Sequence, residues 1–151
     1  MEIVVIISVT IGLLIMFAII KFYTPVMLSR QHYKLLSTAQ QGDLDALAKL
    51  VLEYHNTHYR KHFKQNPAQA VDVFNAAKHL IEIGDENYIS DEEYYTLGSM
   101  YEEGFGTEKD TTKAVEYFNK ALEFIKNLNE EDFKIFESSA ERIKQKLQQY
   151  S

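Results

Sequence analysis

Residues 90–121 read SDEEYYTLGSMYEEGFGTEKDTTKAVEYFNKA and contain the clearest helix signals of the chain. Ser90 and Glu93 have the spacing of a capping box, in which each side chain bonds the other residue's backbone amide and a helix begins. Gly104 and Gly106 can adopt the left-handed backbone conformation that ends a helix. The stretch therefore predicts two helices joined by a tight turn, near residues 91–103 and 111–126.

Small and apolar residues at fixed positions in this stretch resemble the Sel-1-like repeat family, a subclass of tetratricopeptide-type helical repeats. The residues that carry the resemblance are Leu97, Gly98, Tyr101, Gly104, Gly106, Asp110, Lys113, Ala114, Tyr117, Phe118, Lys120 and Ala121. Glu93, Thr107 and Tyr117 depart from the family pattern, which usually has Ala, Val and Trp there. The resemblance implies an all-α solenoid whose helix pairs curve around a groove for a partner protein.

A second, degenerate copy of the pattern lies upstream. Its first helix repeats the spacing of Glu93, Leu97 and Tyr101 with Ala46, Leu50 and Tyr54. Its second helix places Asn66, Ala70, Phe74 and Ala77 where the later copy has Asp110, Ala114, Phe118 and Ala121. A period of about 40–50 residues with two helices per unit is typical of α-solenoids. We therefore expect an all-α fold, a short α-solenoid of about two helix pairs with a C-terminal capping helix.

Helix-starting signals divide the rest of the chain. Gly42 and Asp43 separate two helices, Asn66 and Pro67 begin another, and Asn129 precedes the last. The helices expected from these signals lie near residues 28–41, 43–60, 67–83, 91–103, 111–126 and 130–149. The corresponding organisation is an anchor (1–23), a juxtamembrane segment (24–41), the degenerate repeat (42–84), the Sel-1-like repeat (90–126) and the capping segment (127–151).

An apolar run without a charge, IVVIISVTIGLLIMFAII, occupies residues 3–20. As a helix it would extend about 27 Å at about 1.5 Å per residue, close to the thickness of a bilayer's hydrocarbon core. Pro25 is expected to end or kink that helix. Glu2 stands where a signal peptide has a positive region, and no small-residue cleavage site follows. We therefore expect a single-pass membrane protein of the bacterial inner membrane, anchored through residues 3–20.

The charges are unevenly distributed along the chain. The net charge is −6, but the segment from Lys21 to Lys64 carries +4 and the segment from Gln65 to Asp110 carries −9. The bases nearest the apolar run follow it, so the positive-inside rule places the remainder in the cytoplasm, with the periplasm as the alternative. A basic segment beside a strongly acidic one argues against nucleic-acid binding, which needs a basic footprint over the whole binding face.

Motifs that would support catalysis are missing from the sequence. It has no cysteine, no G-x-S-x-G, no H-E-x-x-H and no phosphate-binding glycine loop. His55, His58 and His62 have the spacing of one helical face and could hold zinc. Alternatively, the neighbouring bases make this segment a basic and aromatic patch that faces lipid headgroups or an acidic partner. We expect no enzymatic activity, no cofactor and no small-molecule substrate.

The family resemblance implies a scaffold or adaptor that recruits a partner protein; an immunity protein that neutralises a toxic effector is the alternative. In helix-pair solenoids the first helix of each pair usually lines the concave side. The residues that face away from the core on these helices are the expected partner contacts, namely Tyr95, Ser99 and Glu102 in the second copy and Leu52 and His55 in the first.

Overall fold

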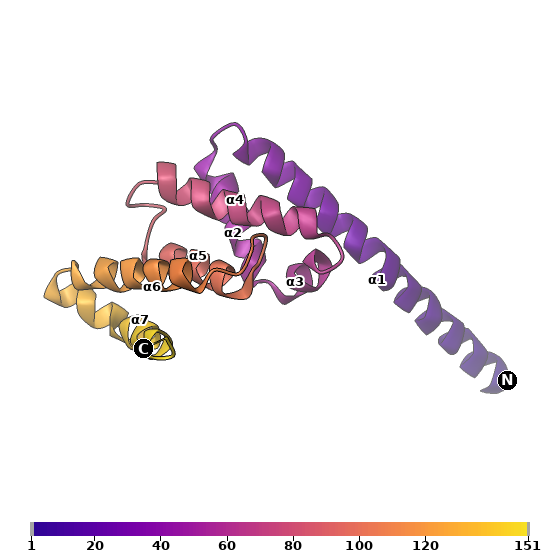
Figure 1. Cartoon of the computed structure of the whole chain (residues 1–151). Coiled ribbons are helices and arrows are strands. Elements are labelled where there is room, and N and C mark those ends of the chain that lie inside the picture. The colour runs from indigo at the N-terminus through magenta and orange to yellow at the C-terminus, as the bar shows by residue number, and fades with distance from the viewer. Residues whose placement is uncertain (1, 151) are drawn as a thin grey trace. The chain divides into compact units, whose positions relative to one another are not determined.

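The computed structural model describes the backbone of residues 2–150 and the side chains of residues 12–17, 23 and 25–150. These residues form seven α-helices and no strand, which confirms the all-α class (Figure 1). The helices are α1 (Glu2–Ala39), α2 (Leu44–His55), α3 (Thr57–Phe63), α4 (Pro67–Ile83), α5 (Asp91–Glu103), α6 (Thr111–Lys126) and α7 (Glu130–Gln148). The chain divides into two compact units, Met1–Lys34 and Leu35–Ser151.

The first unit consists of the greater part of α1. The expectation was that Pro25 would end or kink a helix. The helix does not end there, because α1 is a single 38-residue helix that includes the proline. Proline in a helix interior removes one backbone hydrogen bond and crowds the preceding turn, which is a local cost.

The prediction that residues 3–20 cross a membrane is contradicted. Most of that run lies outside the residues whose side chains the structure describes, and no helix in the described part is long and apolar enough to cross a membrane. This finding contradicts the predicted single-pass anchoring and the predicted inner-membrane localisation, including the choice between cytoplasm and periplasm.

The second unit is built from helices that pack in pairs. α2 packs against α4, α5 against α6, and α7 against α6, while α4 also contacts α5. The core between the helices contains the residues that define the predicted pattern, all 7% exposed or less. They are Ala46, Leu50, Tyr54, Ala70, Phe74 and Ala77 from α2 and α4, and Leu97, Tyr101, Ala114, Phe118 and Ala121 from α5 and α6.

Gly98 allows α5 and α6 to approach closely. A Cβ atom at this position would lie 2.8 Å from the ring of Phe118 and 3.2 Å from the carbonyl oxygen of Ala114. Both distances are shorter than ordinary van der Waals contact, so a larger side chain would push the helices apart. The predicted role of this glycine is confirmed.

Side-chain caps confirm four predicted helix starts, at Asp43, Ser90, Asp110 and Asn129, whereas Asn66 precedes α4 without a side-chain cap hydrogen bond. Asp43 Oδ1 accepts a hydrogen bond from the backbone amide of Ala46 at 2.8 Å, and Asp110 Oδ1 accepts one from Lys113 at 3.0 Å. Ser90 forms the predicted capping box. The helix bounds predicted for residues 67–83, 91–103 and 111–126 agree with α4, α5 and α6, and the last predicted helix agrees with α7 to one residue.

One predicted helix, residues 43–60, is two helices. Asn56 is extended, with φ −84° and ψ 118°, and it separates α2 from α3. Its Oδ1 atom accepts hydrogen bonds from the backbone amides of His58 at 2.9 Å and Tyr59 at 3.4 Å. The Asn56 side chain thereby offers the backbone an alternative to a continuous helix and starts α3 in a new direction.

Candidate functional site

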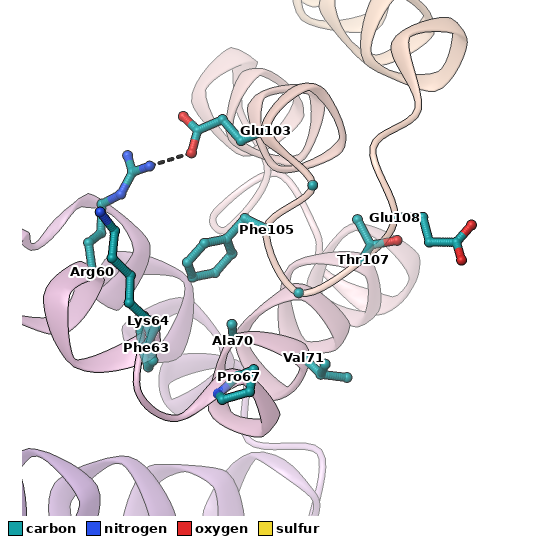
Figure 2. A pocket seen from close by; sticks show the side chains of 12 residues that line it. Arg60, Phe63, Lys64, Pro67, Ala70, Val71, Glu103, Phe105, Thr107 and Glu108 are labelled. Carbon is teal, nitrogen blue, oxygen red and sulfur yellow. Dashed lines mark hydrogen bonds and ion pairs between the residues drawn. The ribbon is translucent and has the colours of Figure 1, made fainter.

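An open groove of about 570 Å³ lies between α3, the first turns of α4 and the loop from α5 to α6 (Figure 2). We call it the α3–α4 groove. Its lining residues are Arg60, Phe63, Lys64, Pro67, Ala70, Val71, Glu103, Gly104, Phe105, Gly106, Thr107 and Glu108. Two segments that are distant in sequence, residues 60–71 and 103–108, therefore form one hollow on the surface of the second unit.

Two left-handed glycines fix the loop that closes the groove. Gly104 ends α5 with φ 71° and ψ 37°, and Gly106 has φ 67°. A Cβ atom on Gly106 would lie 2.1 Å from the carbonyl oxygen of Ala70, so the loop backbone rests directly on α4. The left-handed turn predicted from the sequence is confirmed, and it places residues 104–108 along one side of the groove.

Apolar side chains form the floor and one edge of the groove. The half-buried Phe105 ring packs edge-to-face on Phe63 and Tyr54, with ring centroids 5.5 and 5.0 Å apart. Val71 is 43% exposed, and Pro67 is exposed beside it. This surface is closely packed at its centre and still partly open to solvent, so a partner's apolar side chain can cover it.

Arg60 and Lys64 both project from the α3 side of the groove (Figure 2). The Arg60 guanidinium makes an ion pair with Glu103 and lies 4.8 Å from the centre of the Tyr54 ring. The Tyr54 hydroxyl donates to the other oxygen of Glu103 at 3.0 Å, and burial together with this carboxylate raises the pKa of Tyr54. Lys64 is exposed and has no carboxylate partner in the described part of the chain.

Two of the three partner contacts predicted on α5, Tyr95 and Glu102, contact residues of α7. The Tyr95 ring packs between Phe118, at 5.2 Å, and the Arg142 guanidinium, at 4.2 Å. The Ser99 hydroxyl donates to the carbonyl oxygen of Tyr95 at 3.0 Å and is buried. The contacts of these two side chains are therefore with other residues of the same chain.

Glu102, the third predicted contact on α5, is held by two residues at the C-terminal end of the chain. Lys146 makes an ion pair with it at 2.7 Å, and the Tyr150 hydroxyl donates to its other oxygen. Partial burial acts to raise the pKa of Glu102, but these two hydrogen bonds outweigh it, so the pKa lies below its usual value. Burial and the Glu102 carboxylate together raise the pKa of Tyr150 to about 12.

The two predicted contacts on α2 differ from each other. Leu52 is 64% exposed, whereas the ring of His55 lies with Nε2 2.9 Å from the Thr96 hydroxyl. The structure thus brings His55 next to α5, beside the position of Tyr95. Leu52 remains at the surface of α2.

The three histidines that could have held zinc do not share one helical face, because the break at Asn56 separates His55 from the other two. His62 is buried, with Nε2 2.9 Å from Gln69 Oε1, and His58 is exposed. Among the side chains that the structure describes, no cluster of three or more metal-ligating residues is found.

The sequence did not predict that Phe105, Val71 and Lys64 are neighbours in one groove. A signal for its charged side was present, since no acidic residue occurs between Glu53 and Asp72 while that segment holds three bases and three histidines.

Comparisons with protein-family models, curated proteins and solved structures find no match for this chain.

Proposed function

We propose that this chain is a protein-binding module that holds a segment of a partner protein in the α3–α4 groove. Under this proposal the pairs α2/α4 and α5/α6 are two Sel-1-like repeats of a short α-solenoid, with α7 as the cap. Residues at equivalent positions support the repeat. Leu50 and Leu97 are both fully buried, and Phe74 and Phe118 both lie in the helix-pair core.

The shape of the α3–α4 groove carries the proposal. A floor of packed aromatic rings, an exposed aliphatic edge at Val71 and a charged rim match the apolar centre and polar rim of protein interfaces. Such a floor lets a partner's apolar side chain be buried without reorganising the site, because the Phe105 ring is already packed on two aromatic neighbours. An open groove of this form suits an extended or helical peptide segment.

The test is a selection of peptides from a random display library on the full chain, followed by affinity measurement on two matched variants. Val71→Asp puts a charge at the apolar edge of the groove. Ile83→Asp makes the same kind of change on the same helix, at a residue that is 45% exposed and outside the groove. Covering a valine side chain contributes about 1.5 kcal/mol or more, so we expect Val71→Asp to weaken binding about tenfold.

The control, Ile83→Asp, should bind the selected peptides as the unmodified chain does. A selection that enriches no peptide, or peptides that bind Val71→Asp with undiminished affinity, would show that the α3–α4 groove is not a partner site.

A further inference from the structure

We infer that the segment held in the α3–α4 groove is acidic, with an apolar anchor residue on the aromatic floor and a neighbouring carboxylate against Lys64. This inference rests on the proposed function and adds the chemical class of the partner segment. It is carried by the distribution of charge around the groove.

The α3 wall of the groove is positive. Arg60 and Lys64 stand side by side on it (Figure 2), and the Arg60 charge is already matched by Glu103. The charge left for a ligand is that of Lys64, which ends α3 and is exposed to solvent. No acidic residue of the same segment competes for it, because none occurs between Glu53 and Asp72.

The opposite wall of the groove carries one carboxylate without a basic partner in the groove lining. Glu108 lies on the α5–α6 loop, exposed, on the side away from Arg60 and Lys64 (Figure 2). The charge of Glu103 is offset by Arg60, with which it forms an ion pair. A bound segment therefore has a preferred direction, with its carboxylate toward α3 and its apolar anchor between Phe105 and Val71.

A basic segment would meet the reverse arrangement. In the same orientation its cation would face Lys64, and the two like charges would repel each other. Charge complementarity of this kind chiefly selects partners and speeds their association. The groove thus favours one sign of charge beside the anchor residue.

The experiment measures fluorescence anisotropy of two labelled peptides with the full chain. Both peptides have one phenylalanine; glutamates follow it in the acidic peptide, and lysines replace them in the basic one. Lys64→Glu reverses the charge on the groove wall. Lys61→Glu makes the same change on the same helix, at an exposed residue that does not line the groove.

We expect the acidic peptide to bind the unmodified chain more tightly than the basic one. Because reversing a charge removes an attraction and adds a repulsion, Lys64→Glu should weaken the acidic peptide about tenfold and strengthen the basic one. Lys61→Glu should change either affinity by less than about twofold, since its ammonium lies outside the groove. Far-ultraviolet circular dichroism verifies that both variants are folded.

Equal effects of Lys64→Glu and Lys61→Glu, or a basic peptide that binds as tightly as the acidic one, would overturn the inference. The proposed function, that the groove binds a partner segment, can be tested separately from the charge of that segment. Uncharged peptides that are selected by display and depend on Val71 would refute the acidic partner and leave the groove as a binding site. A display selection without any Val71-dependent peptide would refute both.

Discussion

Replacing Gly106 by alanine should destabilise the second unit more than its small size suggests. Gly106 has φ 67°, a conformation that costs a residue with a Cβ atom about 1–2 kcal/mol. A Cβ atom would also lie 2.1 Å from the carbonyl oxygen of Ala70 and 2.8 Å from Cβ of Phe74. The nearest atom belongs to the α4 backbone and cannot rotate away, so the loop itself must shift.

Overpacking of this kind typically costs about 1–3 kcal/mol. Adding the conformational and the steric contribution gives a loss of about 2–5 kcal/mol in the free energy of unfolding. Gly42→Ala isolates the first contribution. Gly42 has φ 84°, but nothing lies within 4 Å of the position that its Cβ atom would occupy. Its alanine variant should therefore lose only about 1–2 kcal/mol.

Urea unfolding of the full chain and both variants, followed by circular dichroism at 222 nm (a standard wavelength for helix), measures the difference. The denaturation midpoints should fall in the order unmodified chain, Gly42→Ala, Gly106→Ala, with similar slopes. A Gly106→Ala variant as stable as Gly42→Ala would refute the close approach of the α5–α6 loop to α4, and with it the floor of the groove.

Two further substitutions test the core and the C-terminal contact. Tyr101→Ala removes a buried ring that stacks on Tyr117 at 5.6 Å and meets Phe74 edge-to-face at 5.1 Å, so the free energy of unfolding should fall by about 3–5 kcal/mol in the same urea assay; a loss below about 1 kcal/mol would contradict its place in the core. Glu102→Gln removes the charge that Lys146 pairs with. Because the folded pKa of Glu102 lies below its usual value, its stabilisation is present at neutral pH and is lost as the pH falls through that pKa. The unmodified chain should therefore lose more stability than Glu102→Gln between neutral pH and about pH 3, with a difference at pH 7 of at most about 1 kcal/mol; parallel pH profiles would contradict the ion pair.

The helix bounds of the second unit could be predicted because they depend on local signals. Asp43, Ser90, Asp110 and Asn129 each bond amides within three residues of themselves, so the neighbouring sequence contains the whole interaction. The buried face of each helix could be predicted as well, since apolar spacing follows the helical period. These two kinds of information are enough for an all-α assignment.

The break at Asn56 could not be predicted from the same signals. Asparagine occurs both within helices and at their starts, and only the direction that α3 takes decides between the two. The helix through Pro25 illustrates the opposite error, because a residue that usually ends a helix is accommodated within α1.

Contacts with α7 could not be predicted, and they are made by two of the α5 residues that the sequence suggested as partner contacts. Arg142 pairs with Glu92 at 2.7 Å and Lys146 with Glu102, across about 40 to 50 residues of sequence. The local sequence does not predict such pairs, because each of these charged residues alone is typical of a solvated helix face. The α3–α4 groove likewise forms only where residues 60–71 meet residues 103–108, and the sequence alone shows only its acid-free, basic side.

Hydrogen–deuterium exchange of the full chain, with and without a display-selected peptide, shows whether the α3–α4 groove receives a partner segment. If it does, exchange should slow on peptide binding in α3, in the first turns of α4 and at residues 104–108. Protection confined to the α5 face around Tyr95 and Glu102, or to α7, would contradict it, because the partner would then displace the C-terminal helix instead of filling the groove.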